Sequence, residues 1–269
     1  MILDILSSSC PLLLCSMGAL FSDFAGILAI FLEGLISFSA YLMFFFTTTC
    51  NSPISGFIFT CISSVMAVFI FSLIIEKSKA NPFIAATAIN LFFSALPSFF
   101  SSITYGTRGV LYNETFVFNP LSTKVFTLII TALFIAVSFL FLKKTKYGLY
   151  IRITGTDSNV LVAKGVNPLY CRAGAWCAAG FFASTAGCFL AMRVSSFVPN
   201  ISSGRGWMAL AAVYLGKKNP VRIIIAVVIF CAADFFAANI QNFIPQMPAS
   251  VLLSLPYLIV ILMIALGKK

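Results

Sequence analysis

Long apolar runs alternate with short polar segments along the whole chain, and this pattern predicts membrane-spanning helices. A run of about twenty apolar residues is long enough to cross the hydrocarbon core of a bilayer. The runs that meet or approach this length are 5–20, 26–46, 54–75, 83–96, 125–142, 173–192, 223–240 and 250–266. We therefore expect an all-α polytopic membrane protein with about eight spans, built as a single domain over residues 1–269.

Two apolar segments are broken or too short to cross a membrane. The second run is interrupted around residues 26–34, where Glu33 stands beside glycine, and residues 206–216 (GWMALAAVYLG) are far shorter than a span. Irregular backbone is tolerated at membrane depth only where protein or a cavity surrounds it. Paired broken segments are typical of a substrate path, so we interpret 206–216 as a half-helix in a re-entrant segment, 204–220.

The most polar interruption is the stretch 143–172, which carries six of the seventeen basic residues. Residues 156–158 (TDS) supply N-cap chemistry, 159–164 can form about two turns, and Gly165 is placed to end them. Residues 167–168 (NP) match the cap and first position of the next helix. A short helix capped at both ends and held between spans is suited to docking on a partner; an ordinary connecting loop is the alternative.

Small residues recur at every fourth position of the run 173–192, at Ala175, Ala179, Ala183 and Gly187. Such a stripe lets the backbone of a second helix approach closely. The alternative is chance in an alanine-rich span.

Composition agrees with a membrane protein: 61% of the residues are hydrophobic, 9% are charged and the mean hydropathy is +1.06. The net charge of +10 does not point to nucleic acid, because the basic residues stand in short segments at span ends. If the N-terminus lies outside and every segment, including the half-helix, crosses in turn, thirteen basic residues fall inside and four outside. The positive-inside rule therefore predicts an external N-terminus and a cytoplasmic C-terminus. The first run lacks a basic flank and a cleavage site, which indicates a retained span.

Catalytic chemistry finds little support in this sequence. Histidine is absent, the seven acids are scattered, and most of the eight cysteines lie in apolar runs without a C-x-x-C pair. We expect no metal site, no cofactor and no enzymatic activity. A G-x-x-x-x-G-K-[ST] phosphate loop is also absent, so ATP-driven transport requires a separate ATPase chain.

Four polar residues are candidates for a solute path. Glu33 and Asp234 are the acids placed inside spans, where a charge is costly and function is the default hypothesis. Asn90 offers both a donor and an acceptor within the fourth span, and Arg205 is expected at the outer mouth beside the half-helix. The alternatives are structural pairing for the acids and a solvated interfacial charge for Arg205.

Four stretches together resemble a known family, the membrane permease subunits of ABC importers for nucleosides, simple sugars and related solutes. The stretches are GALFSDFAGILAIFLEG (18–34), ANPFIAATAIN (80–90), GTDSNVLVAKGVN (155–167) and GRGWMALAAVYLGKKNP (204–220). The likeness is greatest to the branch that works with nucleoside-type lipoprotein receptors and includes spirochaete riboflavin permeases. It implies a subunit of the bacterial inner membrane, a second permease subunit (identical or different), an ABC ATPase and an external solute-binding lipoprotein.

By this resemblance, Glu33 and Asn90 match motif positions of the permease core, and 155–167 matches the cytoplasmic loop that docks on the ATPase. Val160 and Leu161 stand where the family usually has two alanines. The coupling residues implied are Arg152, Gly155, Asp157, Val160, Leu161, Lys164 and Gly165. We expect Val160, Leu161 and Val162 to offer apolar contacts, with Arg152 and Lys164 as flanking charges.

The residues by themselves leave two other functional classes open. A self-contained secondary transporter could relay protons through Glu33 or Asp234. A purely structural membrane subunit is the third class. Co-purification separates them, because only the ABC permease requires a bound nucleotide-hydrolysing chain.

Overall fold

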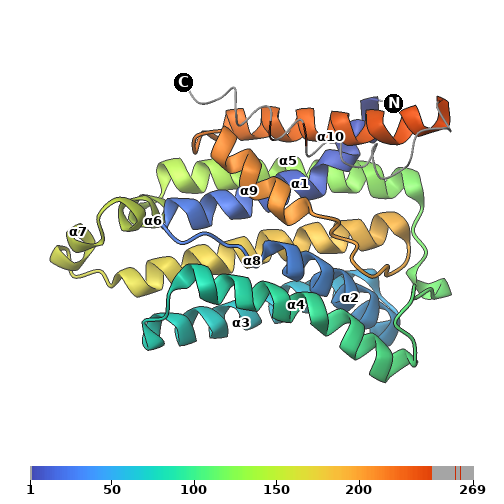
Figure 1. Ribbon diagram of the computed structural model, residues 1–269, viewed down its shortest axis with the longest axis horizontal. Coiled ribbons are helices and arrows are strands. Elements are labelled where there is room, and N and C mark those ends of the chain that lie inside the picture. Colours follow the sequence, from blue (N-terminus) through green and yellow to red (C-terminus); the bar gives the residue numbers. More distant parts are fainter. Residues whose placement is uncertain (1, 244–257, 259–260, 262–269) are drawn as a thin grey trace.

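The computed structural model describes residues 2–243, 258 and 261, and every regular element in that part of the chain is a helix (Figure 1). Seven of these helices are long and apolar enough to span a membrane. The helices are α1 (Ile2–Phe24), α2 (Leu32–Cys50), α3 (Pro53–Ser78), α4 (Pro82–Tyr105), η1 (Glu114–Phe116), α5 (Pro120–Lys144), α6 (Lys146–Thr156), α7 (Ser158–Ala163), α8 (Pro168–Val194), α9 (Arg205–Leu215) and α10 (Pro220–Phe243). The all-α polytopic fold is confirmed; the predicted last span, 250–266, lies almost entirely outside the described residues.

Four helices begin with the same two residues, asparagine followed by proline. Each asparagine side chain accepts a hydrogen bond from the backbone N–H two positions later, and each proline occupies the first helical position, which needs no N–H donor. The pairs are Asn81–Pro82, Asn119–Pro120, Asn167–Pro168 and Asn219–Pro220. The pair at α8 confirms the helix start expected from the sequence.

Helix α8 lies at the centre of the bundle, with α1 and α5 on one side and α2 and α3 on the other (Figure 1). Its small-residue stripe makes close packing possible. A Cβ atom added at Gly187 would collide with the carbonyl oxygen of Ile36 in α2, and one added at Gly18 of α1 would stand 3.1 Å from the Cα atom of Ala179. The close approach predicted for the stripe is therefore confirmed.

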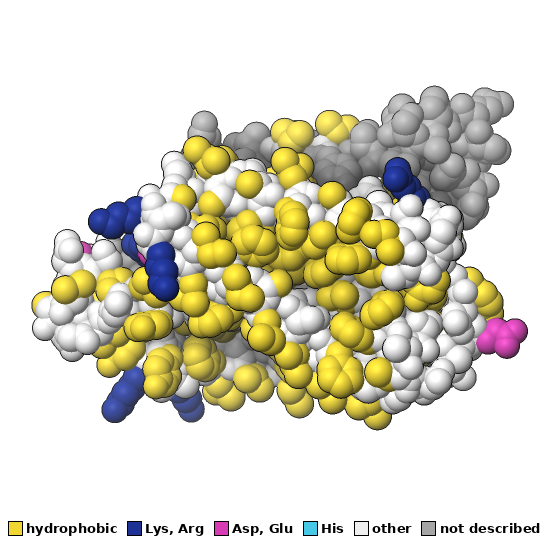
Figure 2. Space-filling view, turned by 90° about the horizontal axis from the view of Figure 1, so that it is seen from below, with side chains coloured by type: hydrophobic (Ala, Val, Ile, Leu, Met, Phe, Trp, Pro, Cys, Tyr) yellow, Lys and Arg dark blue, Asp and Glu magenta, His cyan; other side chains and the backbone are white. Residues whose placement is uncertain are grey.

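The outer helices α3, α4, α5 and α10 are mostly uncovered, since 22–33% of the residues in their apolar windows are buried, against 67–83% in α1, α2 and α8. Their uncovered faces carry apolar side chains, and one face of the molecule shows these side chains across its middle (Figure 2). Their covered faces carry hydroxyls, as at Thr123, Thr127 and Ser138 of α5, which bond to backbone oxygens of their own helix. This apolar-out arrangement is the one that a lipid solvent favours.

Basic residues gather at the end of the bundle that holds α6 and α7 (Figure 2). That end also receives the α3–α4 and α9–α10 connections (Figure 1). Eleven of the thirteen basic residues predicted inside belong to these segments or to the helix ends that adjoin them, and Lys268 and Lys269 lie outside the described residues.

The structure corrects two boundaries predicted from hydropathy. The second span begins at Leu32, because residues 25–31 are not helical, so Glu33 lies in a first helical turn rather than at a break within a helix. The fourth span does not end at Pro97, which lies inside α4, and the helix continues to Tyr105. A proline removes one helical hydrogen bond, and membrane helices tolerate that loss where neighbouring groups compensate.

Candidate functional site

Two helices start inside the bundle rather than at its ends. The start of α2 follows the non-helical segment 25–31, and the start of α9 follows the irregular segment 195–204 (Figure 1). The first N–H groups of any helix lack partners within that helix. Without water at membrane depth, each unpaired N–H group costs several kcal/mol. Side chains must therefore supply the missing acceptors at both starts.

The carboxylate of Glu33 caps the start of α9. Its Oε1 atom accepts hydrogen bonds from the backbone N–H of Gly204 (2.7 Å) and from the hydroxyl of Ser202 (2.6 Å). Its Oε2 atom accepts from the backbone N–H of Gly206 at 2.6 Å. A negative charge at a helix N-terminus is also stabilised by the helix dipole. These contacts explain how an acid is accommodated inside the bundle.

The side chain of Asn90 in α4 caps the start of α2, the helix that contains Glu33. The side-chain Oδ1 atom of Asn90 accepts a hydrogen bond from the backbone N–H of Gly34 at 2.7 Å. The glycine is required there, because a Cβ atom at position 34 would collide with the Asn90 carbonyl oxygen. One buried amide therefore holds the start of α2, and α2 in turn presents the carboxylate that holds the start of α9.

The structure thus brings together Glu33, Asn90 and the half-helix start that carries Arg205. Within the protein, Glu33 and Asn90 both act as helix caps, and the Asn90 side chain is only 7% exposed. A contact between either side chain and the solute stays a prediction. Sequence reasoning missed Ser202 and the glycines of the Gly204–Arg205–Gly206 triplet as the partners of Glu33.

Arg205 is the first residue of α9, whose start meets Glu33 through the neighbouring Gly206; its expected position at the outer mouth stays a prediction. Its guanidinium Nη1 donates to the backbone oxygens of Ile201 and Ser202, both at 3.2 Å. Asp234, half-buried on α10, is close enough for its charge to interact with that of Arg205. The charges of Arg205 and Asp234 therefore lie near each other beside the half-helix.

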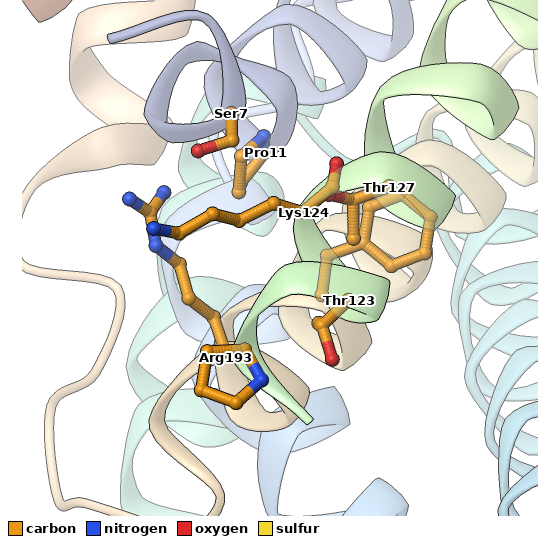
Figure 3. Close-up of a pocket in the computed structure, with 8 residues that line it drawn as sticks. Ser7, Pro11, Thr123, Lys124, Thr127 and Arg193 are labelled. Carbon is orange, nitrogen blue, oxygen red and sulfur yellow. The ribbon is translucent and has the colours of Figure 1, made fainter. Parts of the chain in front are cut away.

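A polar pocket of about 270 Å³ lies at the end of the bundle opposite α7, between α1, α5 and α8. Ser7, Thr123 and Thr127 contribute hydroxyls to its lining. Figure 3 shows the side chains of Lys124 and Arg193 extending from α5 and α8 toward the start of α1. Lys124 pairs with Asp4 at 2.7 Å, and Arg193 donates to the hydroxyl of Ser8 at 2.9 Å. The lining is suited to polar groups of a small solute.

At the basic end, the predicted short helix forms as α7, with the predicted caps. The side chain of Asp157 accepts from the backbone N–H of Asn159 at 2.9 Å, and Gly165 has a left-handed φ of +73°. One expected contact is corrected, because Leu161 is completely buried whereas Val160 and Val162 are 42% and 61% exposed. With 3.6 residues per turn, consecutive side chains of a helix point about 100° apart. Three consecutive residues therefore cannot all face the same partner.

Helix α6 approaches the start of the non-helical segment closely at Gly155. A Cβ atom at Gly155 would collide with the backbone oxygen of Phe24, and one at Gly26 would stand 3.1 Å from the Cα atom of Gly155. Gly26 also has a left-handed φ of +76°. At these two glycines, the backbone of α6 therefore touches the backbone of the 25–31 segment directly.

The family model described as "Branched-chain amino acid transport system / permease component" matches residues 1–266 of this chain. The chain belongs to this permease family. Curated relatives have similar length: a nucleoside ABC transporter permease, NupC of Lactococcus lactis subsp. cremoris, is 25% identical over 98% of this chain and 90% of its own. A guanosine ABC transporter permease, NupQ of Bacillus subtilis, is 25% identical over 94% and 86%. A putative glucose ABC transporter permease, TsgC13 of Haloferax volcanii, is 29% identical over 86% and 74%.

A solved structure shares the fold of this permease. PsaBC from Streptococcus pneumoniae, solved in complex with Fab, superposes with a TM-score of 0.61 at 13% identity, covering 96% of this chain and 88% of the other. The resemblance to nucleoside and simple-sugar permeases stated from the sequence is confirmed. The chain is thus the permease component of an ABC transporter rather than a self-contained secondary transporter, and ATP hydrolysis lies in a separate subunit.

The capping role of Glu33 predicts a loss of stability when its charge is removed. Glu33→Gln replaces one acceptor oxygen by an NH2 group, which then faces a backbone N–H donor of α9. We expect the permease to lose about 1–3 kcal/mol of stability, the typical cost of an unsatisfied buried polar group. This corresponds to a fall in Tm of roughly 2–4 °C per kcal/mol. Thermal unfolding of purified protein measures it.

The matched control is Glu76→Gln, which weakens an ion pair with Arg172 (3.5 Å) near the basic end and should change stability by less than about 1 kcal/mol. If Glu33→Gln leaves Tm unchanged but alters the apparent affinity for solute, the carboxylate contacts the solute rather than holding α9.

Proposed function

We propose that this permease imports a nucleoside in the bacterial inner membrane, receiving it from a solute-binding lipoprotein and moving it with energy from a cytoplasmic ABC ATPase. Two relatives named for nucleoside or guanosine transport match at least 94% of the chain and support this solute class. The relative named for glucose makes a simple sugar the second candidate. Riboflavin, suggested by the sequence resemblance, is a further aromatic solute to be tested.

The distribution of charge supports the orientation in this proposal. Eleven basic residues lie in the segments at the α6–α7 end, against Arg108, Lys124 and Arg193 in the segments of the opposite end. By the positive-inside rule, the α6–α7 end faces the cytoplasm and the N-terminus faces outside. The solute would then be delivered at the end that holds the polar pocket of Ser7, Thr127 and Arg193.

The observation that carries the solute proposal is the uncovered face of α9. Trp207 and Tyr214 lie seven residues apart, which places them on one face of the helix, and their side chains are 48% and 73% exposed. Exposed aromatic side chains on a half-helix within a transport subunit can stack on a base. We propose that a second permease subunit, identical or different, encloses this face and that the solute passes between the two.

Removal of the Trp207 ring should weaken nucleoside uptake. Stacking of a base on an aromatic side chain contributes about 1–3 kcal/mol, so Trp207→Ala should raise the apparent KM by roughly ten-fold, while Trp207→Phe retains much of the affinity. Uptake of labelled guanosine, riboflavin and glucose into proteoliposomes holding the whole transporter measures the effect and ranks the solutes. Phe99→Ala, which removes a 57% exposed ring from α4, is the control. Equal KM values for Trp207→Ala and the control would exclude this face from the path.

The ATPase would dock on α7 through its two exposed valines. Val160 and Val162 can enter an apolar groove, with Arg152 and Lys164 available to acidic groups beside it. Burial of one valine contributes roughly 1.5–3 kcal/mol. The buried Leu161 would instead maintain the shape of the segment.

Val162→Asp should therefore abolish docking without unfolding the permease. Position 162 is 61% exposed, so water solvates the new carboxylate in the free permease. In the interface with the ATPase, the same carboxylate would be buried without a partner. ATP hydrolysis recovered with tagged permease should fall at least about ten-fold, while the Tm stays within error. Val162→Ala is the conservative control. Leu161→Asp should lower Tm as well, since position 161 is buried. Normal ATPase recovery with Val162→Asp would show that α7 is only a connector.

The glycine contact between α6 and the 25–31 segment would transmit ATPase movement to the path. Gly155 touches the backbone at Phe24 and Gly26, and the same segment leads into α2, whose Glu33 holds α9. A displacement of α6 would thus reach both internal helix starts through one stretch of backbone.

Gly155→Ala should uncouple hydrolysis from transport. The added methyl group collides with the Phe24 carbonyl oxygen and separates α6 from the segment, yet it leaves the exposed face of α7 unchanged. We expect normal ATPase recovery with uptake reduced by roughly ten-fold or more. Gly165→Asn is the control, because nothing lies within 4 Å of a Cβ atom there and asparagine tolerates a left-handed φ. Uptake unchanged by Gly155→Ala would exclude this contact from coupling.

A further inference from the structure

A second pocket, of about 230 Å³, opens at the basic end of the bundle. Three cationic side chains from three separate segments line it: Lys143 from the last turn of α5, Arg152 from α6, and Lys218 from the α9–α10 connection. Apolar surface from Phe24, Phe139 and Pro220 completes much of the wall. We propose that this pocket binds the phosphate group of an anionic membrane lipid.

The three cations are held against aromatic rings. The Nζ atom of Lys143 lies 4.2 Å from the ring centroid of Phe139. Arg152 and Lys218 lie 5.8 Å and 6.0 Å from the centroid of one ring, that of Phe24. Because the same ring borders both side chains, their positive charges are kept near each other in spite of mutual repulsion. An anion placed between them relieves that repulsion.

The charge of the pocket is not balanced by the protein. Among the described residues that line it there is no acid. Asp23 stands beside it and pairs with Lys218 at 3.4 Å. One carboxylate against three cations leaves about two positive charges, so the pocket can take the negative charge of a phosphate diester.

The position of the pocket favours a lipid over a soluble anion. Its walls include the end of α5 and the start of α10, which are the outer helices with long uncovered apolar faces. Leu140 of α5 and Val221 of α10, each next in sequence to a lining residue, are 50% and 57% exposed. The cations therefore stand where the apolar surface meets the basic end, at the level of lipid phosphates. A basic pocket between spans at such a boundary is a general form of headgroup site.

The test compares wild type with the double variant Lys143→Gln, Lys218→Gln. Purified permease is exchanged into detergent containing phosphatidylglycerol or phosphatidylcholine, and bound lipid is counted by native mass spectrometry. Removal of two of the three cations should lower retained phosphatidylglycerol by about ten-fold or more. Phosphatidylcholine should be retained poorly by both proteins. The control is Lys144→Gln, Lys79→Gln, which removes the same charge from the same end without altering the lining.

The other outcomes each overturn the proposal. Equal retention of phosphatidylglycerol by the double variant and the control would show that the pocket is not the lipid site. Stabilisation of wild type by inorganic phosphate alone, lost in the double variant, would reassign the pocket to a soluble anion. Loss of ATPase recovery with unchanged lipid retention would assign the cations to the protein partner.

Discussion

The structure depends on how backbone N–H groups at the starts of α2 and α9 are paired inside a membrane protein. Asn90 accepts from α2, and Glu33 accepts from α9. Because Glu33 itself stands in the first turn of α2, the two contacts act in series. The half-helix α9 thus keeps its place only if α2 does, and α2 is held by α4. Ser37 and Ser202 extend the network with a hydrogen bond of 2.8 Å.

Close packing around α8 makes this arrangement possible. The glycine at position 187 lets the backbone of α2 approach α8, and Trp176 of α8 donates to the backbone oxygen of Ile27 at 3.2 Å in the non-helical segment. The rigid centre therefore supports the irregular backbone on both sides. The outer helices contribute few buried residues and provide the apolar surface that faces lipid.

The irregular segment 25–31 connects the two ends of the proposed mechanism. On one side it meets α6 through Gly155 and Gly26, and on the other it leads into α2 and its carboxylate. Contacts made by backbone leave little room for side chains to adjust, so in the proposed mechanism a displacement of α6 would be transferred rather than absorbed. The capping contacts of Glu33 explain how an acid is accommodated within a transport subunit.

The sequence by itself determined the class of the protein, the existence of most spans, the short capped helix at 158–163 and the half-helix at 205–215, because hydropathy, glycine and N-cap chemistry act over a few neighbouring residues. It also drew attention to Glu33 and Asn90, since polar groups are costly in lipid. Only the tertiary structure decided what they contact. Their partners at Gly204, Gly206 and Gly34 are 56 to 173 residues away in the sequence. The burial of Leu161 likewise depends on how α7 folds back, which no local pattern of apolar residues specifies.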